Sequence, residues 1–331
     1  APAEVAVSLV NSAGHRRETL ELRLVALWES GEEIAAALDA HLTNGSTADV
    51  VTGEKVGRGD KTAFVFGGNG AQWAGMGLEL YEDDAAFRTG FDEVSDLFAE
   101  GSDVNLSDML VSEDLSEALA ESSVAQPILF ALQVALVKSL EAQGRRPDAV
   151  AGHSVGEVAA AWCAGVLSLE DAVHLIRTRS TALEVMRGTG GMAAVLAGVE
   201  AVEEALAEFG DSSVSIAADN SPRSSTIAGP VDALKAFAKF ARKRRVAAKL
   251  LDIDYPYHSA GIDPIRGKLI NDLAGLKPNP GHAIYVSSTS GREAPGVALD
   301  TEYWWRNARQ PVQFREAVDA LARLGCGDFI E

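Results

Sequence analysis

The feature that most limits how this chain can fold is a serine between two glycines, at the junction of an apolar run and a helix-forming run. Residues 152–156 read Gly-His-Ser-Val-Gly, with Ala149, Val150 and Ala151 before them and Glu-Val-Ala-Ala-Ala-Trp after them. The glycines permit a sharp strand-to-helix turn, which exposes the hydroxyl of Ser154 at the top of a parallel sheet. The following helix aims its first N–H groups at the same place, where they favour a developing oxyanion. The pattern predicts an α/β fold with Ser154 as a nucleophile; an ordinary strand-to-helix loop is the alternative.

The segments around this turn predict other parts of an α/β core. Residues 61–73 begin with a short continuous apolar run, as a buried parallel strand does, and then break into a glycine-rich turn. Residues 124–142 form an apolar helix with Pro127 in its first turn, where proline is tolerated. Strand and helix patterns of the same kind return at 282–291 and 311–323.

The pattern between these stretches differs and predicts an inserted subdomain. From residue 191 to 254 the order is strand, helix, strand, strand, helix and strand, the βαββαβ order of a ferredoxin-like unit. We therefore expect a core of residues 61–190 and 255–331, with residues 191–254 inserted into it.

Residues 1–60 predict a small appended α/β unit. Residues 20–28 alternate apolar and polar side chains as a half-buried strand does, and residues 31–42 have helical spacing. Residues 43–60 are rich in glycine, threonine and charge, which is typical of a linker.

Charge and cysteine content exclude several classes of protein. The formal net charge of −19 comes from acids scattered along the chain, which argues against a nucleic-acid-binding face and for a soluble protein. No apolar run approaches the roughly 20 residues that cross a bilayer, and the N-terminus lacks the pattern of a secretion signal. Cys163 and Cys326 are too few for a disulfide framework, and no metal-ligand spacing accompanies them. We expect a cytoplasmic protein without a membrane, a metal or a nucleic-acid partner.

One arginine lies on the apolar face of a predicted helix. The helix starts at Ser168 as N-cap, and at about 100° per residue its apolar stripe lies within about 60° of Arg179. The stripe consists of Ala172, Leu175, Ile176, Leu183 and Met186. A desolvated guanidinium is costly unless an anion meets it. That anion is either an acid of the protein itself or a bound carboxylate, which the planar guanidinium can hold with two hydrogen bonds.

A base for Ser154 is to be sought among six histidines. His258, in Tyr-Pro-Tyr-His after the inserted subdomain, is the best candidate, because a histidine of pKa about 6.5 can take and return a serine proton. His153 adjoins the serine, but a neighbour on a tight turn usually points elsewhere, so a structural or substrate-flanking role suits it better. A triad would also need an acid between serine and histidine, or else a backbone carbonyl would orient the imidazole in a dyad. The acids available by position are Asp219, Asp252 and Asp254.

These residues carry a resemblance to a known family. The chain resembles the malonyl-CoA:acyl-carrier-protein transacylases, and more closely the acyltransferase domains of type I polyketide synthases. The matching blocks are FVFGGNGAQWAGMG at 64–77, AQP at 125–127, GHSVGEVAAAWCAGVLSLEDAV at 152–173, ADNSPRSSTIAGP at 218–230, PYHS at 256–259 and YWWRNARQPVQF at 303–314. The resemblance covers essentially the whole chain. Residues 1–60 look like a linker from a ketosynthase to its acyltransferase, and the chain stops at GDFIE, where the family usually continues.

The resemblance implies an α/β-hydrolase-like core with a ferredoxin-like subdomain. It implies that Ser154 is the nucleophile, that His258 is the base and that Arg179 recognises a carboxylate. The backbone N–H groups of Asn69 and Val155 would form the oxyanion hole.

Three positions refine this assignment. Gln126 matches an active-site glutamine of the family. Asn69 stands where glutamine is usual, and Gly67 where proline is common. A backbone N–H survives both changes, so the resemblance still implies an oxyanion hole.

The acyl group is indicated by two side chains. Tyr257 precedes the base, where malonyl-selective members often carry an aromatic ring and methylmalonyl-selective members a serine. Val155 stands where methylmalonyl-selective members often have glutamine. The resemblance thus implies acyl-CoA, preferably malonyl-CoA, as substrate, an acyl carrier protein as acceptor, a neighbouring ketosynthase and no cofactor. The alternatives are a serine hydrolase or thioesterase, a non-catalytic docking domain, and a family member selective for methylmalonyl or a starter group.

A basic cluster on the second predicted helix of the insertion stands out in an acidic chain. It consists of Lys235, Lys239, Arg242, Lys243, Arg244 and Arg245. The cluster is either a contact for a carrier protein or for coenzyme A phosphates, or a solvated helix face.

Overall fold

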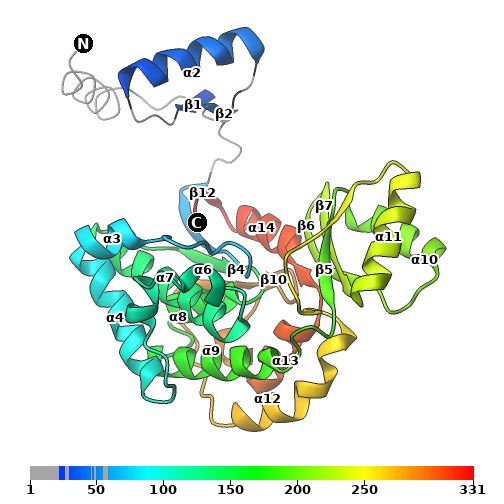
Figure 1. Cartoon of the computed structure of the whole chain (residues 1–331). Helices are drawn as coiled ribbons and strands as arrows, with labels where there is room; N and C mark the ends of the chain where they lie inside the picture. Colours follow the sequence, from blue (N-terminus) through cyan, green and yellow to red (C-terminus); the bar gives the residue numbers. More distant parts are fainter. Residues whose placement is uncertain (1–21, 27–29, 46, 48–49, 55–58) are drawn as a thin grey trace. The chain divides into compact units, whose positions relative to one another are not determined.

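The computed structural model of the chain describes residues 22–26, 30–45, 47, 50–54 and 59–331. The chain divides into two compact units, residues 1–58 and residues 59–331, and each is described by itself (Figure 1).

The N-terminal unit contains two paired strands and the helix that connects them. Strands β1 (Leu22–Ala26) and β2 (Val50–Glu54) are antiparallel, and helix α2 (Gly31–Asn44) connects them. The helix begins at a capping box, in which Ser30 Oγ accepts from the N–H of Glu33 at 3.3 Å and the Glu33 carboxylate accepts from the N–H of Ser30 at 3.1 Å.

These elements confirm two predictions and correct a third. The strand predicted at 20–28 and the helix predicted at 31–42 are both present, although residues 20–21 and 27–29 lie outside the described residues. The linker predicted at 43–60 is wrong in part, because β2 lies within it. Val50, Val51 and Thr52 are β-branched, and pairing with β1 outweighs the glycine and charge around them.

The larger unit contains a five-stranded, mostly parallel sheet. Its order is β10 (Arg292–Glu293), β9 (Ile284–Ser287), β4 (Ala149–Gly152), β3 (Lys61–Phe66) and β12 (Cys326–Ile330). Only β10 and β9 are antiparallel neighbours. Helices α8 (Gly156–Cys163) and α14 (Phe314–Arg323) both pack against β4, which is buried along its whole length. The strands predicted near residues 61, 149 and 284 are confirmed.

Helix α7 (Ser122–Ala142) lies in the main hydrophobic core. It packs against α4 (Ala85–Ala99) and α9 (Leu169–Glu184). The largest wholly buried side chains of this core include Phe87, Phe91, Phe130, Leu132 and Trp304. The remaining helices of four or more residues around this sheet are α3 (Leu78–Asp83), α5 (Leu106–Leu110), α6 (Leu115–Ala118), α12 (Arg266–Asp272), α13 (Thr301–Arg309) and the 3₁₀ helix Ala260–Ile265.

Helix α7 departs from the sequence predictions in two respects. It is long and apolar enough to cross a membrane, contrary to the expectation that no run approaches that length, but 78% of its apolar window is buried, as in a core helix. It also begins two residues earlier than predicted, so Pro127 lies in its second turn rather than its first. There the proline removes one backbone hydrogen bond of the helix.

A second five-stranded sheet stands beside the first within the larger unit (Figure 1). Its order is β11 (Val312–Gln313), β6 (Ser215–Ser221), β7 (Ser224–Gly229), β5 (Gly191–Val195) and β8 (Ala248–Leu250). The last four strands are antiparallel neighbours, and helices α10 (Val199–Phe209) and α11 (Val231–Lys243) pack on them around Phe237. The predicted succession of strands and helices is therefore present. The sequence did not predict that β11 would join this sheet, parallel to β6.

Candidate active site

Ser154 lies on the sharp turn between β4 and α8. Its backbone is left-handed, with φ of 54°, which residues with a side chain rarely adopt. A Cβ on Gly152 would collide with the backbone of Gly156 and Glu157, and a Cβ on Gly156 with the carbonyl of Phe66. The two glycines of the motif are therefore required by the close approach of the backbone, and the predicted turn is present.

The hydroxyl of Ser154 and the imidazole of His258 are joined by a hydrogen bond. Ser154 Oγ lies 2.7 Å from His258 Nε2, and His258 Nδ1 lies 2.8 Å from the backbone carbonyl of Gln310. Because a carbonyl only accepts, Nδ1 carries the proton and Nε2 is left to accept from the serine.

This arrangement follows the dyad alternative of the sequence analysis. A backbone carbonyl orients the imidazole, and the three acids considered for a triad, Asp219, Asp252 and Asp254, do not. Asp219 instead forms an ion pair with Arg315 at 2.7 Å, which joins β6 to α14.

Burial keeps the imidazole neutral. Burial, the positive charge of Arg179 and the nearby His153 together lower the pKa of His258 from 6.5 to about 3. At neutral pH the ring is therefore a proton acceptor, as a general base must be.

Arg179 projects from α9 into the same place. Its side chain is buried, with 3% exposed, and burial lowers the pKa of the guanidinium to about 10, so it stays protonated at neutral pH. Nη1 donates to the side-chain oxygen of Asn307, and Nη2 donates to Ser154 Oγ at 3.3 Å. Nε has no hydrogen-bond partner within the described residues. Among the described residues an amide, not an acid, thus contacts this cation, and its buried Nε–H has no hydrogen-bond partner there.

Two backbone N–H groups lie at the same site. Asn69 follows β3 in the glycine-rich turn and lines the cavity beside Ser154, and Val155 immediately precedes α8. Neither N–H has a hydrogen-bond partner within residues 59–331. The side chain of Asn69 is engaged elsewhere, since its oxygen accepts from Gln72 at 3.2 Å. Free N–H donors near a nucleophile are what an oxyanion hole requires.

The other predicted site residues differ in how they lie relative to Ser154 and the cavity beside it. Tyr257 is buried, stacks on Tyr255 with ring centroids 5.0 Å apart, and lines the cavity with Ser154. His153 lines it too, but its Nε2 bonds to Asn220 at 2.9 Å rather than to the serine. Gln126 is buried and donates to the hydroxyl of Ser122 at 2.9 Å. It forms no hydrogen bond with Ser154 among the described residues.

Sequence reasoning missed two residues that hold the site together. Asn307 contacts Arg179 and the backbone carbonyl of Ser154, and Glu157 contacts Asn307. Glu157 carried a usable signal, because it is the single charged residue of the otherwise uncharged helix at 156–163. Asn307 carried none, since an asparagine in a polar, aromatic helix is unremarkable by composition.

The cavity at the dyad is small, about 80 Å³, and lies between the two sheets of the larger unit. Asn69 and Ser154 line it from the first sheet's loops, and Met192 and Ala218 from the second sheet. No group of three or more His, Cys, Asp or Glu side chains suited to a metal ion occurs in the part of the chain that the structure describes.

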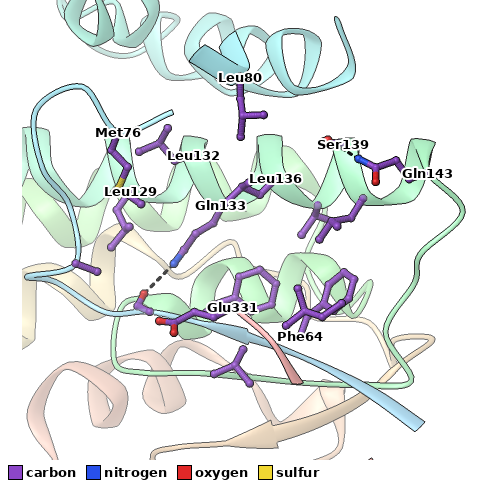
Figure 2. A pocket seen from close by; sticks show the side chains of 17 residues that line it. Phe64, Met76, Leu80, Leu129, Leu132, Gln133, Leu136, Ser139, Gln143 and Glu331 are labelled. Carbon is purple, nitrogen blue, oxygen red and sulfur yellow. Dashed lines mark hydrogen bonds between the residues drawn. The ribbon is translucent and has the colours of Figure 1, made fainter. Parts of the chain in front are cut away.

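A larger apolar cavity, of about 570 Å³, lies between α7 and the strands β3 and β12 (Figure 2). Phe64, Leu80, Leu132 and Leu136 are among its lining residues, and none of the predicted site residues is. The side chain of Gln133, on α7, donates to the carbonyl of Gly67 at 2.8 Å; a dashed line marks the bond at Gln133 in Figure 2. This bond ties the glycine-rich turn, which carries Asn69, to the core.

Comparison with known proteins gives a consistent family. Residues 63–331 match the sequence model described as the acyl transferase domain. The chain is 36% identical over 315 residues to the mycoketide-CoA synthase of Mycobacterium tuberculosis, covering 95% of this chain and 8% of that protein. It is 37% identical over 329 residues to the spectinabilin polyketide synthase system protein NorA' of Streptomyces orinoci, covering 99% and 9%. The chain therefore spans less than a tenth of the length of each of these relatives.

A solved structure is similar over the whole chain. The acyltransferase domain from module 8 of the salinomycin polyketide synthase has a TM-score of 0.82 and 36% sequence identity. The match covers 99% of this chain and 77% of that one.

The low pKa of His258 predicts that Ser154 stays reactive in mild acid. Intact mass measures the labelling of Ser154 by phenylmethylsulfonyl fluoride. The labelling rate should stay unchanged as the pH falls through 6.5, because the imidazole of His258 stays neutral there, and it should decline only as the pH approaches the lowered pKa of His258, about 3. Arg179→Ala should move the decline to higher pH, since losing the positive charge and hydrating the site both raise the pKa of His258. Ser154→Ala is the control, and circular dichroism defines the usable pH range. A wild-type decline centred at pH 6.5 would contradict this account.

Proposed function

This chain belongs to the acyl transferase domain family, and we propose that it transfers an acyl group, preferably malonyl, from coenzyme A to the phosphopantetheine thiol of an acyl carrier protein. The observation that carries the proposal is the 2.7 Å hydrogen bond between Ser154 and His258, beside a buried guanidinium that no acid among the described residues contacts. The named relatives are much longer polyketide synthases, so the carrier protein and a ketosynthase would be other parts of such a protein.

The first half-reaction acylates the enzyme. Ser154 Oγ attacks the thioester carbonyl while its proton passes to His258 Nε2. The N–H groups of Asn69 and Val155 hold the oxyanion, an effect of about 3 kcal/mol for one donor. The intermediate collapses, the carbon–sulfur bond breaks, and His258 returns the proton to the leaving thiolate. An acyl ester on Ser154 and free coenzyme A remain.

The second half-reaction repeats these steps with a different thiol. The carrier's phosphopantetheine thiol gives its proton to His258 and attacks the ester, and the proton then returns to Ser154 as it leaves. Two successive acyl transfers through a covalent enzyme predict ping-pong kinetics. The reaction as proposed requires no metal and no redox cofactor.

The choice of malonyl rests on Arg179 and Tyr257. The N–H groups of Nε, which has no partner among the described residues, and of the adjoining Nη2 of Arg179 can donate to the two oxygens of the free carboxylate of malonyl. The buried ring of Tyr257 lines the cavity, where it would crowd a methyl branch at the α-carbon. A single pocket side chain provides about 1–3 kcal/mol of such discrimination, so methylmalonyl remains the nearest competitor. We assign His153 and Gln126 to the surroundings of the substrate.

The same residues weigh on the rival functions. A hydrolase or thioesterase would use the same dyad with water as acceptor, but it leaves the buried, protonated Arg179 without an anionic partner. A starter-loading domain, whose acyl group has no free carboxylate, would also leave Arg179 without an anionic partner. A docking domain with a decayed site would have no need of a neutral, correctly oriented imidazole against Ser154.

Further parts of the assignment concern the fold and its setting. The order β6-β7-β5-β8 with antiparallel neighbours supports a ferredoxin-like subdomain at 191–254. The parallel sheet with Ser154 at a strand-to-helix turn supports an α/β-hydrolase-like core of residues 61–190 and 255–331. We also propose that residues 1–60 form the linker to a ketosynthase and that the protein acts in the cytoplasm.

The basic cluster on α11 is our candidate for the carrier-protein contact. All six side chains are exposed, and Lys239 and Arg242 line a hollow of about 470 Å³ between α11 and β8. Lys235 and Arg244 form ion pairs with Asp232 and Glu208, whereas Lys239 and Arg242 form none with described residues. Carrier proteins are generally acidic, so a cationic face on a chain of net charge −19 suits such a partner.

Intact mass after incubation with malonyl-, methylmalonyl- or acetyl-CoA tests the proposed function. A malonyl adduct that is absent in Ser154→Ala and weak with acetyl-CoA is expected, because Arg179 favours a carboxylate. A dominant methylmalonyl adduct would keep the mechanism and overturn the role given to Tyr257. Rapid release of coenzyme A without an adduct would favour a hydrolase, and neither adduct nor release would favour a non-catalytic domain.

Charge reversal tests the carrier contact. The triple variant Lys239→Glu, Arg242→Glu and Lys243→Glu should lower the rate of transfer to the carrier by about tenfold or more, because electrostatic steering is lost. Self-acylation from malonyl-CoA should be unchanged.

A matched control reverses three exposed charges elsewhere, with Arg145→Glu, Arg146→Glu and Lys277→Glu. It changes the net charge equally and should leave both rates as they are. Slower self-acylation in the α11 variant would assign the cluster to coenzyme A phosphates instead, and unchanged rates throughout would eliminate any contact.

A further inference from the structure

We propose that Glu157, acting through the side-chain amide of Asn307, positions the guanidinium of Arg179 for the carboxylate of the substrate. The inference rests on the proposed function, which gives Arg179 that carboxylate as its ligand. Glu157 would be a positioning residue, since neither it nor Asn307 takes part in proton transfer.

Glu157 is a wholly buried acid surrounded by donors. Its exposed fraction is 0%, and burial raises the pKa of its carboxyl. Five hydrogen bonds nevertheless end on its two oxygens. They come from the N–H of Ser288, the N–H and hydroxyl of Thr289 at 3.1 and 3.4 Å, the hydroxyl of Tyr303 at 2.5 Å and Nδ2 of Asn307 at 2.9 Å. The three N–H donors among them can only donate, so the pocket calls for acceptor oxygens on both sides, which the carboxyl group of Glu157 supplies.

The carboxylate fixes which way the amide of Asn307 faces. Asn307 Nδ2 lies 2.9 Å from Glu157 Oε2 and 3.1 Å from the carbonyl of Ser154, and both of these groups only accept. The amide oxygen must then face Arg179, whose Nη1 donates to it. If the amide turned over, its oxygen would face the oxygens of Glu157 and Ser154, and its NH₂ would face the N–H groups of Arg179.

The contact from Glu157 through Asn307 to Arg179 stabilises the guanidinium but uses few of its N–H donors. Asn307 engages one terminal nitrogen of Arg179, and the negative charge of Glu157 opposes the loss of its proton from one residue away. A direct ion pair would instead consume the donors that a carboxylate ligand needs. With the acid set behind an amide, Nε has no partner in the part of the chain that the structure describes, and the hydrogen bond of Nη2 there goes to the hydroxyl of Ser154, at 3.3 Å.

A purely structural role predicts something different. Glu157 also ties α8 to the turn after β9 and to α13, so its loss could simply loosen the fold. Loosening would slow acylation by any acyl-CoA alike. A misplaced Arg179 would slow acylation selectively for substrates that carry a free carboxylate.

Glu157→Gln tests this contact with little change in shape. The glutamine oxygen can still accept from Ser288 and Thr289, but its NH₂ would face the NH₂ of Asn307, so the hydrogen bond that holds this amide against Arg179 would be lost. The ratio of acylation kcat/KM for malonyl-CoA over acetyl-CoA should fall about tenfold or more, as for a lost hydrogen bond to a charged group. Asn307→Ala should lower the same ratio, and the double variant should lose no more than the larger single loss.

The control and the outcomes separate this inference from the proposed function. Glu302→Gln, an exposed acid on α13 that pairs with Arg266, should leave the ratio unchanged. A wild-type protein that neither substrate acylates would overturn the proposed function and this inference together. A wild-type preference for malonyl that Glu157→Gln leaves intact, with both rates lowered equally, would overturn the inference alone. If Glu157→Gln does not fold, Asn307→Ala takes its place: a lower malonyl-to-acetyl ratio supports the inference, and equally lowered rates with the ratio intact overturn it.

Discussion

The burial of one cation, Arg179, is the constraint around which the site is arranged. A guanidinium with 3% exposure and no contacting acid among the described residues is expensive to desolvate; the amide of Asn307 accepts from it, and the nearby Glu157 favours its protonated form. The same positive charge helps to lower the pKa of His258. This buried charge thus adds to the effect of burial in keeping the imidazole of His258 neutral, and no acid among the described residues contacts it.

The serine and the histidine share a second constraint, which is backbone geometry. Both have left-handed backbones, with φ of 54° for Ser154 and 57° for His258, and such strain persists only where the surroundings enforce it. At the serine, glycines at 152 and 156 allow β3, β4 and α8 to approach closely. At the histidine, the carbonyls of Ala308 and Gln310 accept from its backbone N–H and its Nδ1. In the proposed dyad, this orientation by the backbone would take the place of a third, acidic side chain.

Much of this could be predicted from the sequence, and the failures have physical causes. Local patterns located Ser154, and helical spacing located Arg179, because each departs from its neighbours within a single element. Comparison of the six histidines made His258 the best candidate for the base, whereas Gln126 needed the family resemblance, since a core glutamine carries no local signal. Strand β2 and the pairing of β11 with β6 were missed, because both depend on pairing with residues distant in the sequence. The contact of Asn307 with Arg179 spans 128 positions of sequence and could not be seen in any window.

The central claim is that Arg179 is completed by the carboxylate of the substrate. The most direct measurement is the rate of acylation of Ser154 by malonyl-CoA and by acetyl-CoA, compared between the wild type and Arg179→Ala by rapid-quench intact mass. The account predicts a strong wild-type preference for malonyl that falls to about equal rates in the variant, mainly because malonyl transfer slows, by an amount typical of a charge-assisted hydrogen-bond pair. A malonyl preference that survives in the variant would contradict it.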